Sequence, residues 1–213
     1  MATNFLYDGP EDGRVTVLLA HGAGAPMDSA GMTAIARALA TREFRVARFE
    51  FGYMAARRSG ERRPPPRADT LIGEYVAAVD DLGPTEGPLI IGGHSMGGRV
   101  ASMAADALFD AKRIAGLLCL SYPFHPPGRP TQLRTAHLSG LKTPALFVEG
   151  TRDEFGSPAE IAGYGLPKSI EIAWLEDGDH SLKPRKAISG FTYAQHMASM
   201  ADAAAEWAAR LVP

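Results

Sequence analysis

The stretch that decides the fold is Leu89–Met103, which reads LIIGGHSMGGRVASM. A short apolar run stops at two glycines, and apolar residues return at helical spacing after Gly97. This pattern predicts a strand that passes directly into a helix. Ser95 lies at the junction, between Gly93 and Gly97. The stretch is therefore either a tight glycine-rich turn that happens to contain a serine, or a turn that exposes a nucleophile.

Apolar runs of strand length alternate with helical periodicity along the rest of the chain. The expected strands span residues 15–20, 44–51, 88–93, 114–120, 144–150 and 170–176. The expected helices span residues 32–39, 71–82 and 100–108 and a last segment that starts at Thr192. Such alternation, with near-continuous apolar strands, is typical of a mostly parallel central sheet with helices on both faces. We predict a single α/β domain over residues 1–213, whose ligands bind beyond the carboxyl ends of the strands.

Two of these helices carry recognisable start signals. Asp28 or Ser29 is available to cap the first helix. Thr192 and Gln195 have the spacing of a capping box at the start of the last helix. Apolar residues then repeat at steps of three and four, which predicts a face that docks on the sheet.

The composition of the 213 residues is that of an ordinary globular protein, with 46% hydrophobic and 22% charged residues. The net charge of −2 gives no reason to expect nucleic acid or an anionic membrane as a partner. The N-terminus lacks a signal-peptide pattern, and no apolar run reaches the about 18 residues of a membrane helix. Cys119, the only cysteine, is expected in a buried strand, and no spacing predicts a metal site. We expect a cytoplasmic protein without metal or cofactor, and its oligomeric state stays open.

Chemistry at Ser95 needs more than an exposed hydroxyl. A serine is a poor nucleophile at neutral pH, so it needs a base to take its proton and donors for the oxyanion that forms on the substrate. A sharp strand-to-helix turn crowds the backbone, which favours glycine two residues before and after the serine. The pentapeptide Gly93–Gly97 meets that demand and has the required strand before it and helix after it. This context favours a nucleophile over a plain turn.

These residues resemble the nucleophile elbow of the α/β-hydrolase superfamily. The resemblance implies a triad in the order serine, acid, histidine, with the acid and the histidine after late strands. Asp153 follows the expected strand 144–150, and His180 follows the expected strand 170–176. The resemblance therefore assigns Ser95 as nucleophile, His180 as base and Asp153 as the acid that orients it. Two other aspartates close to His180 remain alternatives for the acid, namely Asp177 and Asp179.

The same resemblance implies an oxyanion hole made of two backbone N–H groups. One belongs to Met96, directly after the nucleophile. The other comes from the loop HGAG at residues 21–24, where the family pattern points to Ala23, with Gly24 as second choice. His21 in this loop is expected to be structural.

Four motifs resemble those of a smaller group within this superfamily. HGAG, SMGGR, GTRDEFG and DHSLKP together are similar to small hydrolases grouped with the α/β-hydrolase-like domain of an NSL-complex regulatory subunit. The chain is also similar in size to dienelactone hydrolases. Those enzymes use a cysteine nucleophile where this chain has Ser95. This departure favours the hydrolysis of an ester or thioester over their lactone chemistry.

The segments around the expected site predict an open pocket. Residues 121–144 are too few and too rich in proline to form a cap domain. Tyr122 and Phe124 follow a strand end and are candidates to line the pocket, as is Gly24. An arginine-rich stretch, expected to be a loop, contains Arg57, Arg58, Arg62, Arg63 and Arg67. Arg57 and Arg58 are candidates to bind an anionic group of the substrate, and the alternative is a solvated surface loop.

The function predicted from the sequence is that of a serine hydrolase. It would cleave a carboxylic ester or thioester of a small acyl substrate, neutral or anionic, through an acyl-enzyme and without a cofactor. The alternative is a binding or scaffold module that keeps the fold with little or no catalysis.

Overall fold

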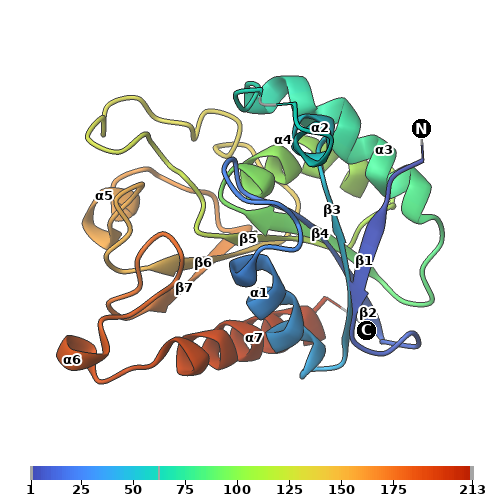
Figure 1. Cartoon of the computed structure of the whole chain (residues 1–213). Coiled ribbons are helices and arrows are strands. Elements are labelled where there is room, and N and C mark those ends of the chain that lie inside the picture. Colours follow the sequence, from blue (N-terminus) through green and yellow to red (C-terminus); the bar gives the residue numbers. More distant parts are fainter. Residues whose placement is uncertain (1, 62, 212–213) are drawn as a thin grey trace.

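The computed structural model describes residues 2–61 and 63–211. A seven-stranded sheet runs through the centre, with the strand order β1-β3-β2-β4-β5-β6-β7 (Figure 1). Neighbouring strands are parallel except for β1, which is antiparallel to β3. The strands are β1 (Phe5–Asp8), β2 (Val15–Ala20), β3 (Phe44–Phe49), β4 (Leu89–His94), β5 (Gly116–Leu120), β6 (Ala145–Gly150) and β7 (Ile170–Leu175). The predicted mostly parallel α/β sheet is confirmed.

Strand β1 was not predicted. Its four residues, FLYD, are only partly buried, and Tyr7 is exposed. The strand pairs with β3 on one side, at the edge of the sheet. A four-residue edge strand has too little apolar periodicity to stand out from a loop, whereas β2, β5 and β6 are buried along their whole length.

Helices cover both faces of the sheet. One face carries α1 and α7, and the other carries α3 and α4 (Figure 1). The helical elements are α1 (Ala30–Ala40), α2 (Gly52–Arg58), the 3-10 helix η1 (Ala68–Leu71), α3 (Ile72–Leu82), α4 (Met96–Asp110), α5 (Pro158–Ala162), α6 (Lys186–Ser189) and α7 (Tyr193–Ala209). Ser29 caps α1, and Thr192 forms the expected capping box with Gln195.

Helix α2 corrects an expectation. The arginine-rich stretch was predicted to be a loop throughout, but Gly52–Arg58 is helical. Tyr53 and Met54 of this helix are buried against the core, and this burial stabilises a helix that is only two turns long. Only two side chains of this short, arginine-rich segment are buried, so its sequence shows little helical periodicity.

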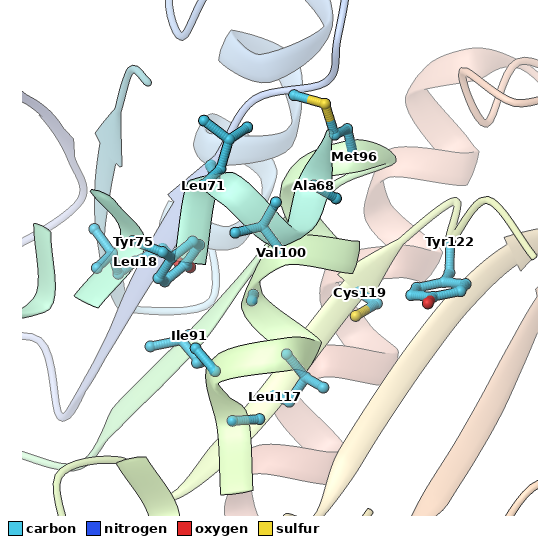
Figure 2. Close-up of a cluster of buried hydrophobic side chains, with 14 of the residues drawn as sticks. Leu18, Ala68, Leu71, Tyr75, Ile91, Met96, Val100, Leu117, Cys119 and Tyr122 are labelled. Carbon is cyan, nitrogen blue, oxygen red and sulfur yellow. The ribbon is translucent and has the colours of Figure 1, made fainter. Parts of the chain in front are cut away.

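The core on the α4 face is built around Tyr75. This side chain is fully buried, and its hydroxyl lies 2.9 Å from the Leu18 carbonyl oxygen. The hydroxyl also accepts the Gly92 N–H at 2.8 Å, so one residue of α3 ties together the central strands β2 and β4. Figure 2 shows Tyr75 in this cluster, with Val100 of α4 packed among the side chains of the sheet.

No cap domain covers the carboxyl edge of the sheet. Residues 121–144, all of which the structure describes, contain turns and bends but neither helix nor strand. The predicted absence of a cap is confirmed. Within residues 2–61 and 63–211, no helix has the combined length and apolar character that crossing a membrane requires.

Helix α4 approaches the sheet so closely that its first turn requires glycine. A Cβ atom on Gly97 would overlap the Ala20 carbonyl oxygen of β2 and lie 2.7 Å from the His21 carbonyl oxygen. Both obstacles are backbone atoms, which cannot rotate away. Gly97 therefore sets the distance between α4 and the end of β2.

We expect Gly97→Ala to lower the free energy of unfolding by about 2 kcal/mol or more, because it overpacks a rigid contact. Gly73→Ala is the matched control, since Gly73 lies in α3 and nothing is within 4 Å of its added Cβ. That change should stabilise the protein by up to about 1 kcal/mol, as alanine favours helix more than glycine does. Urea unfolding followed by circular dichroism measures both, and equal effects would contradict the close-packing argument.

Candidate active site

Ser95 occupies the sharp turn between β4 and α4. Its backbone angles are φ 52° and ψ −116°, which a residue with a side chain rarely adopts. The Ser95 N–H donates to the Leu120 carbonyl oxygen at 2.8 Å, which fixes the turn to the end of the neighbouring strand β5. The surrounding strand and helix hold the serine in this strained conformation, and strain of this kind concentrates at functional sites.

The structure brings Ser95, His180 and Asp153 together in one hydrogen-bonded line. The Ser95 Oγ lies 2.8 Å from His180 Nε2, and His180 Nδ1 lies 2.8 Å from Asp153 Oδ2. A carboxylate can only accept, so Nδ1 carries the proton and Nε2 is free to accept from the serine hydroxyl. The Asp153 side chain is almost completely buried, and its Oδ1 accepts the Phe155 N–H at 2.9 Å. This arrangement can draw a proton from Ser95.

Parallel strands explain why residues so far apart in sequence meet. Ser95 follows β4, Asp153 follows β6 and His180 follows β7. All three strands run in the same direction, so their carboxyl ends lie at one edge of the sheet.

The two other candidate acids have different partners. Asp177 forms ion pairs with Arg185 and Arg152, and hydrogen bonds from Arg185 lower the pKa of Asp177 to about 2. Asp179 Oδ1 accepts the backbone N–H of Ser181 at 2.8 Å, within its own turn. Of the three aspartates considered, Asp153 is the one placed against the imidazole.

Two neighbours of His180 were not predicted. His94 Nε2 lies 2.9 Å from the His180 carbonyl oxygen, and burial lowers the pKa of His94 to about 4, so a neutral ring donates this bond. The Phe155 ring stacks on the imidazole with 3.9 Å between ring centroids. His94 directly precedes Ser95, and Phe155 is two residues after Asp153. Their contacts with His180 become apparent only in the folded structure.

The two residues whose backbone N–H groups are expected to form an oxyanion hole, Met96 and Ala23, both line the cavity beside Ser95. Met96 is the first residue of α4, so its N–H belongs to the first turn, whose N–H groups have no partner inside the helix. Ala23 lines the same cavity as Ser95 and Met96, and its carbonyl oxygen accepts the Tyr53 hydroxyl at 3.0 Å. Gly24 is exposed and does not line this cavity.

His21 is structural, as expected. It is fully buried, and its Nε2 accepts the Phe51 N–H at 3.2 Å. Its Nδ1 donates to the Gly22 carbonyl oxygen at 2.7 Å. Burial lowers the pKa of His21, which keeps the ring neutral and able to accept. His21 thereby ties the HGAG loop to the segment that follows β3.

A cavity of about 600 Å³ opens beside Ser95. Its lining combines apolar side chains with several charged ones: Ala23, Pro66, Arg67, Ala68, Asp69, Ser95, Met96, Arg99, Met103, Pro123, Arg134 and Phe155. The cavity extends along α4, because Met96, Arg99 and Met103 recur at steps of three and four on one face of that helix.

Tyr122 and Phe124 do not line the cavity, which corrects their assignment as pocket residues. Both are fully buried, and Pro123 between them faces the cavity instead. The Tyr122 ring packs against Phe124 and Phe147, with ring centroids 4.9 Å and 5.1 Å away. The two side chains belong to the hydrophobic core and not to the surface of the cavity.

Arg57 and Arg58 do not line the cavity either. Arg58 donates to Glu50 at 2.7 Å and 2.8 Å and pairs with Asp28, so its charge is already compensated. The Arg57 guanidinium lies over the Tyr53 ring, 5.6 Å from the centroid. The structure therefore places neither arginine at the cavity beside Ser95, where they were predicted to bind an anionic group of the substrate.

The other arginines of the stretch differ. Arg63 pairs with Glu61 at the surface, and Arg62 lies outside the described residues. Arg67 lines the cavity, where it binds Asp69 through two hydrogen bonds of 3.1 Å and 2.8 Å. Two arginines outside the stretch, Arg99 and Arg134, also line the cavity, and neither was predicted to do so.

Comparison with known proteins places the chain in a family. Residues 13–209 match the model of the alpha/beta hydrolase domain, so the chain belongs to that family. This match confirms the prediction that the protein is an α/β-hydrolase.

Three solved structures illustrate the likeness in fold. A lidless α/β serine hydrolase from Xanthomonas campestris is 20% identical, with a TM-score of 0.72, covering 99% of this chain and 90% of that one. A dienelactone hydrolase from Anabaena variabilis is 18% identical, with a TM-score of 0.72 and coverages of 99% and 93%. Est1E from Butyrivibrio proteoclasticus, with ferulic acid bound, is 16% identical, with a TM-score of 0.69 and coverages of 97% and 96%. The fold is thus shared with proteins of low sequence identity.

The strained backbone of Ser95 gives a stability prediction. Glycine adopts φ 52° without steric strain, whereas alanine at this position remains strained because it has a Cβ atom. Ser95→Gly should therefore be more stable than Ser95→Ala by about 1 kcal/mol. Thermal unfolding of the two purified variants, which both lack the hydroxyl, measures the difference. If Ser95→Ala were the more stable variant, the turn would not be strained as described.

Proposed function

We propose that this protein is a serine hydrolase that cleaves small carboxylic esters or thioesters through an acyl-enzyme. The observation that carries the proposal is the hydrogen-bonded line from Ser95 through His180 to Asp153 at the edge of an open cavity. A hydroxyl, a neutral imidazole and a buried carboxylate in this order form the arrangement used for acyl transfer on several unrelated folds.

Each side chain has a defined role in the proposed reaction. The Ser95 Oγ attacks the substrate carbonyl carbon while His180 Nε2 takes the hydroxyl proton. His180 then gives this proton to the departing alcohol or thiol, which leaves the acyl group on Ser95. Water repeats the sequence and releases the acid. Asp153 holds the Nδ1–H tautomer and stabilises the imidazolium that forms in each step.

Two backbone donors are proposed to stabilise the oxyanion. The Met96 N–H lies at the N-terminus of α4, where the helix dipole also favours negative charge. The Ala23 N–H would supply the second bond from the loop that His21 and Tyr53 hold in place. Such donors act on charge that exists only in the transition state and the intermediate, so they raise the rate of the chemical step.

The size of the cavity favours a small substrate. A volume of about 600 Å³ falls within the usual range for small-molecule sites, and no cap domain closes over it. The bound ferulic acid in Est1E is an aromatic acid of compatible size, which supports small acyl groups as the first substrates to test. The arginines of the lining also favour a negatively charged substrate.

Covalent labelling tests the proposal. We expect a fluorophosphonate probe to label the wild-type protein, and Ser95→Ala and His180→Ala to abolish the labelling because nucleophile or base is lost. Asp153→Asn should lower kcat for an aryl ester by about 10⁴-fold, since it favours the wrong imidazole tautomer. Gel fluorescence and release of the aryl alcohol measure these effects.

The matched control is Ser139→Ala, because Ser139 lies at the surface and bonds only within its own turn. It should be labelled like the wild type. A folded wild-type protein that neither reacts with the probe nor hydrolyses any aryl ester would contradict the proposal and favour a binding or scaffold role.

A further inference from the structure

The cavity beside Ser95 contains more positive than negative charge. Three arginines line it, against a single carboxylate, that of Asp69. Asp69 is already bound by Arg67 through two hydrogen bonds. The charges of the other two arginines, Arg99 and Arg134, are therefore not compensated by any carboxylate of the lining.

Arg99 lies on α4, one turn after Ser95. Its N–H donates to the Ser95 carbonyl oxygen at 3.0 Å, which fixes the backbone from which the side chain extends. Within residues 2–61 and 63–211, the Arg99 guanidinium forms neither an ion pair nor a hydrogen bond, and its Nε is buried without a partner. An arginine in this state has donors available for a ligand.

Arg134 reaches the same cavity from the loop after β5. Its N–H donates to the Phe124 carbonyl oxygen at 2.8 Å, and its carbonyl oxygen accepts the Tyr122 hydroxyl at 2.8 Å. These bonds fix its backbone, while its guanidinium has no partner in the described part of the chain. Both arginines line the same cavity. Burial lowers the pKa of Arg134, and the positive charge of Arg99 lowers it further.

The neighbouring polar groups do not compensate these charges. His137 lies 2.8 Å from the Ser102 hydroxyl, and burial together with the charge of Arg99 lowers the pKa of His137 to about 4. It is therefore neutral near pH 7. By contrast, Arg48 is buried elsewhere in the protein and pairs with Asp8 at 2.6 Å. Two partly buried cations without a counter-ion cost free energy that a bound anion would recover.

We propose that Arg99 and Arg134 form an anion subsite that binds a carboxylate carried by the substrate, several bonds away from the scissile carbonyl. This inference rests on the proposed esterase function and specifies its substrate class. Arg99 is four positions after Ser95, a rise of about 6 Å along α4, which a chain of about four to six carbon atoms spans. The apolar side chains of Met96, Met103 and Pro123 line the cavity and would contact such a chain.

Paired substrates test the subsite. We expect kcat/KM for an aryl half-ester of glutaric acid to exceed that for the aryl valerate, its neutral counterpart, by about tenfold, through a lower KM. Arg99→Gln and Arg134→Gln should each lower the ratio of kcat/KM for the half-ester to kcat/KM for the valerate by about tenfold. Circular dichroism and thermal unfolding show that each variant is folded.

The matched control is Arg129→Gln. Arg129 lies in the same loop as Arg134 but is exposed and outside the cavity, so the preference for the half-ester should persist. High salt should weaken the preference in the wild type, since it screens the charges.

A second pair of substrates places the carboxylate on the alcohol part of the ester instead of the acyl part. Here carboxyphenyl butyrate is compared with phenyl butyrate. A preference for the anionic member of either pair that is lost in Arg99→Gln supports the subsite and shows which side of the ester it receives. Equal kcat/KM values within both pairs would overturn it.

Binding without turnover separates this inference from the proposed function. In Ser95→Ala, calorimetry should detect binding of monomethyl glutarate about tenfold tighter than binding of methyl valerate, and adding Arg99→Gln should remove the difference. If no ester is hydrolysed but monomethyl glutarate binds through Arg99, the hydrolase proposal fails and the subsite stands. If esters are hydrolysed but monomethyl glutarate binds no better than methyl valerate, the subsite fails alone.

Discussion

The contact between the start of α4 and the end of β2 is the constraint on which the site depends. Gly97 lets the helix backbone approach Ala20 to a distance that no side chain would permit. That approach forces the sharp turn at Ser95, whose positive φ exposes the hydroxyl at the edge of the sheet. The same edge receives the loops after β6 and β7, which bring Asp153 and His180 within hydrogen-bond distance of one another and of the serine.

Burial sets the protonation of the groups around this line. It lowers the pKa values of His21 and His94, so both rings stay neutral and serve as hydrogen-bonding supports. It also raises the pKa of Glu149, whose buried side chain accepts the Tyr122 N–H at 2.7 Å near Asp153. The raised pKa favours the neutral form of Glu149, which reduces the negative charge beside the carboxylate that faces the imidazole.

The arginines that cluster in the sequence are not the ones whose charges are available in the cavity. The arginine-rich stretch contains Arg58 and Arg67, yet each of these is compensated by carboxylates that fold beside it. Arg99 and Arg134 are isolated in sequence, but both line the cavity, and neither has a counter-ion among residues 2–61 and 63–211. Whether a guanidinium has a partner depends on contacts between distant segments, and a local motif does not contain that information.

The sequence by itself determined the parallel α/β sheet, the elbow at Ser95 and the order in which Asp153 and His180 follow it. These features are local: apolar runs, glycine spacing and residues placed directly after strands encode them. The tertiary structure alone decided that Tyr122 and Phe124 are buried, that Asp177 pairs with arginines instead of His180, and that β1 adds an edge strand. Burial and the choice of partner depend on which segments pack together, so they are fixed only when the whole chain has folded.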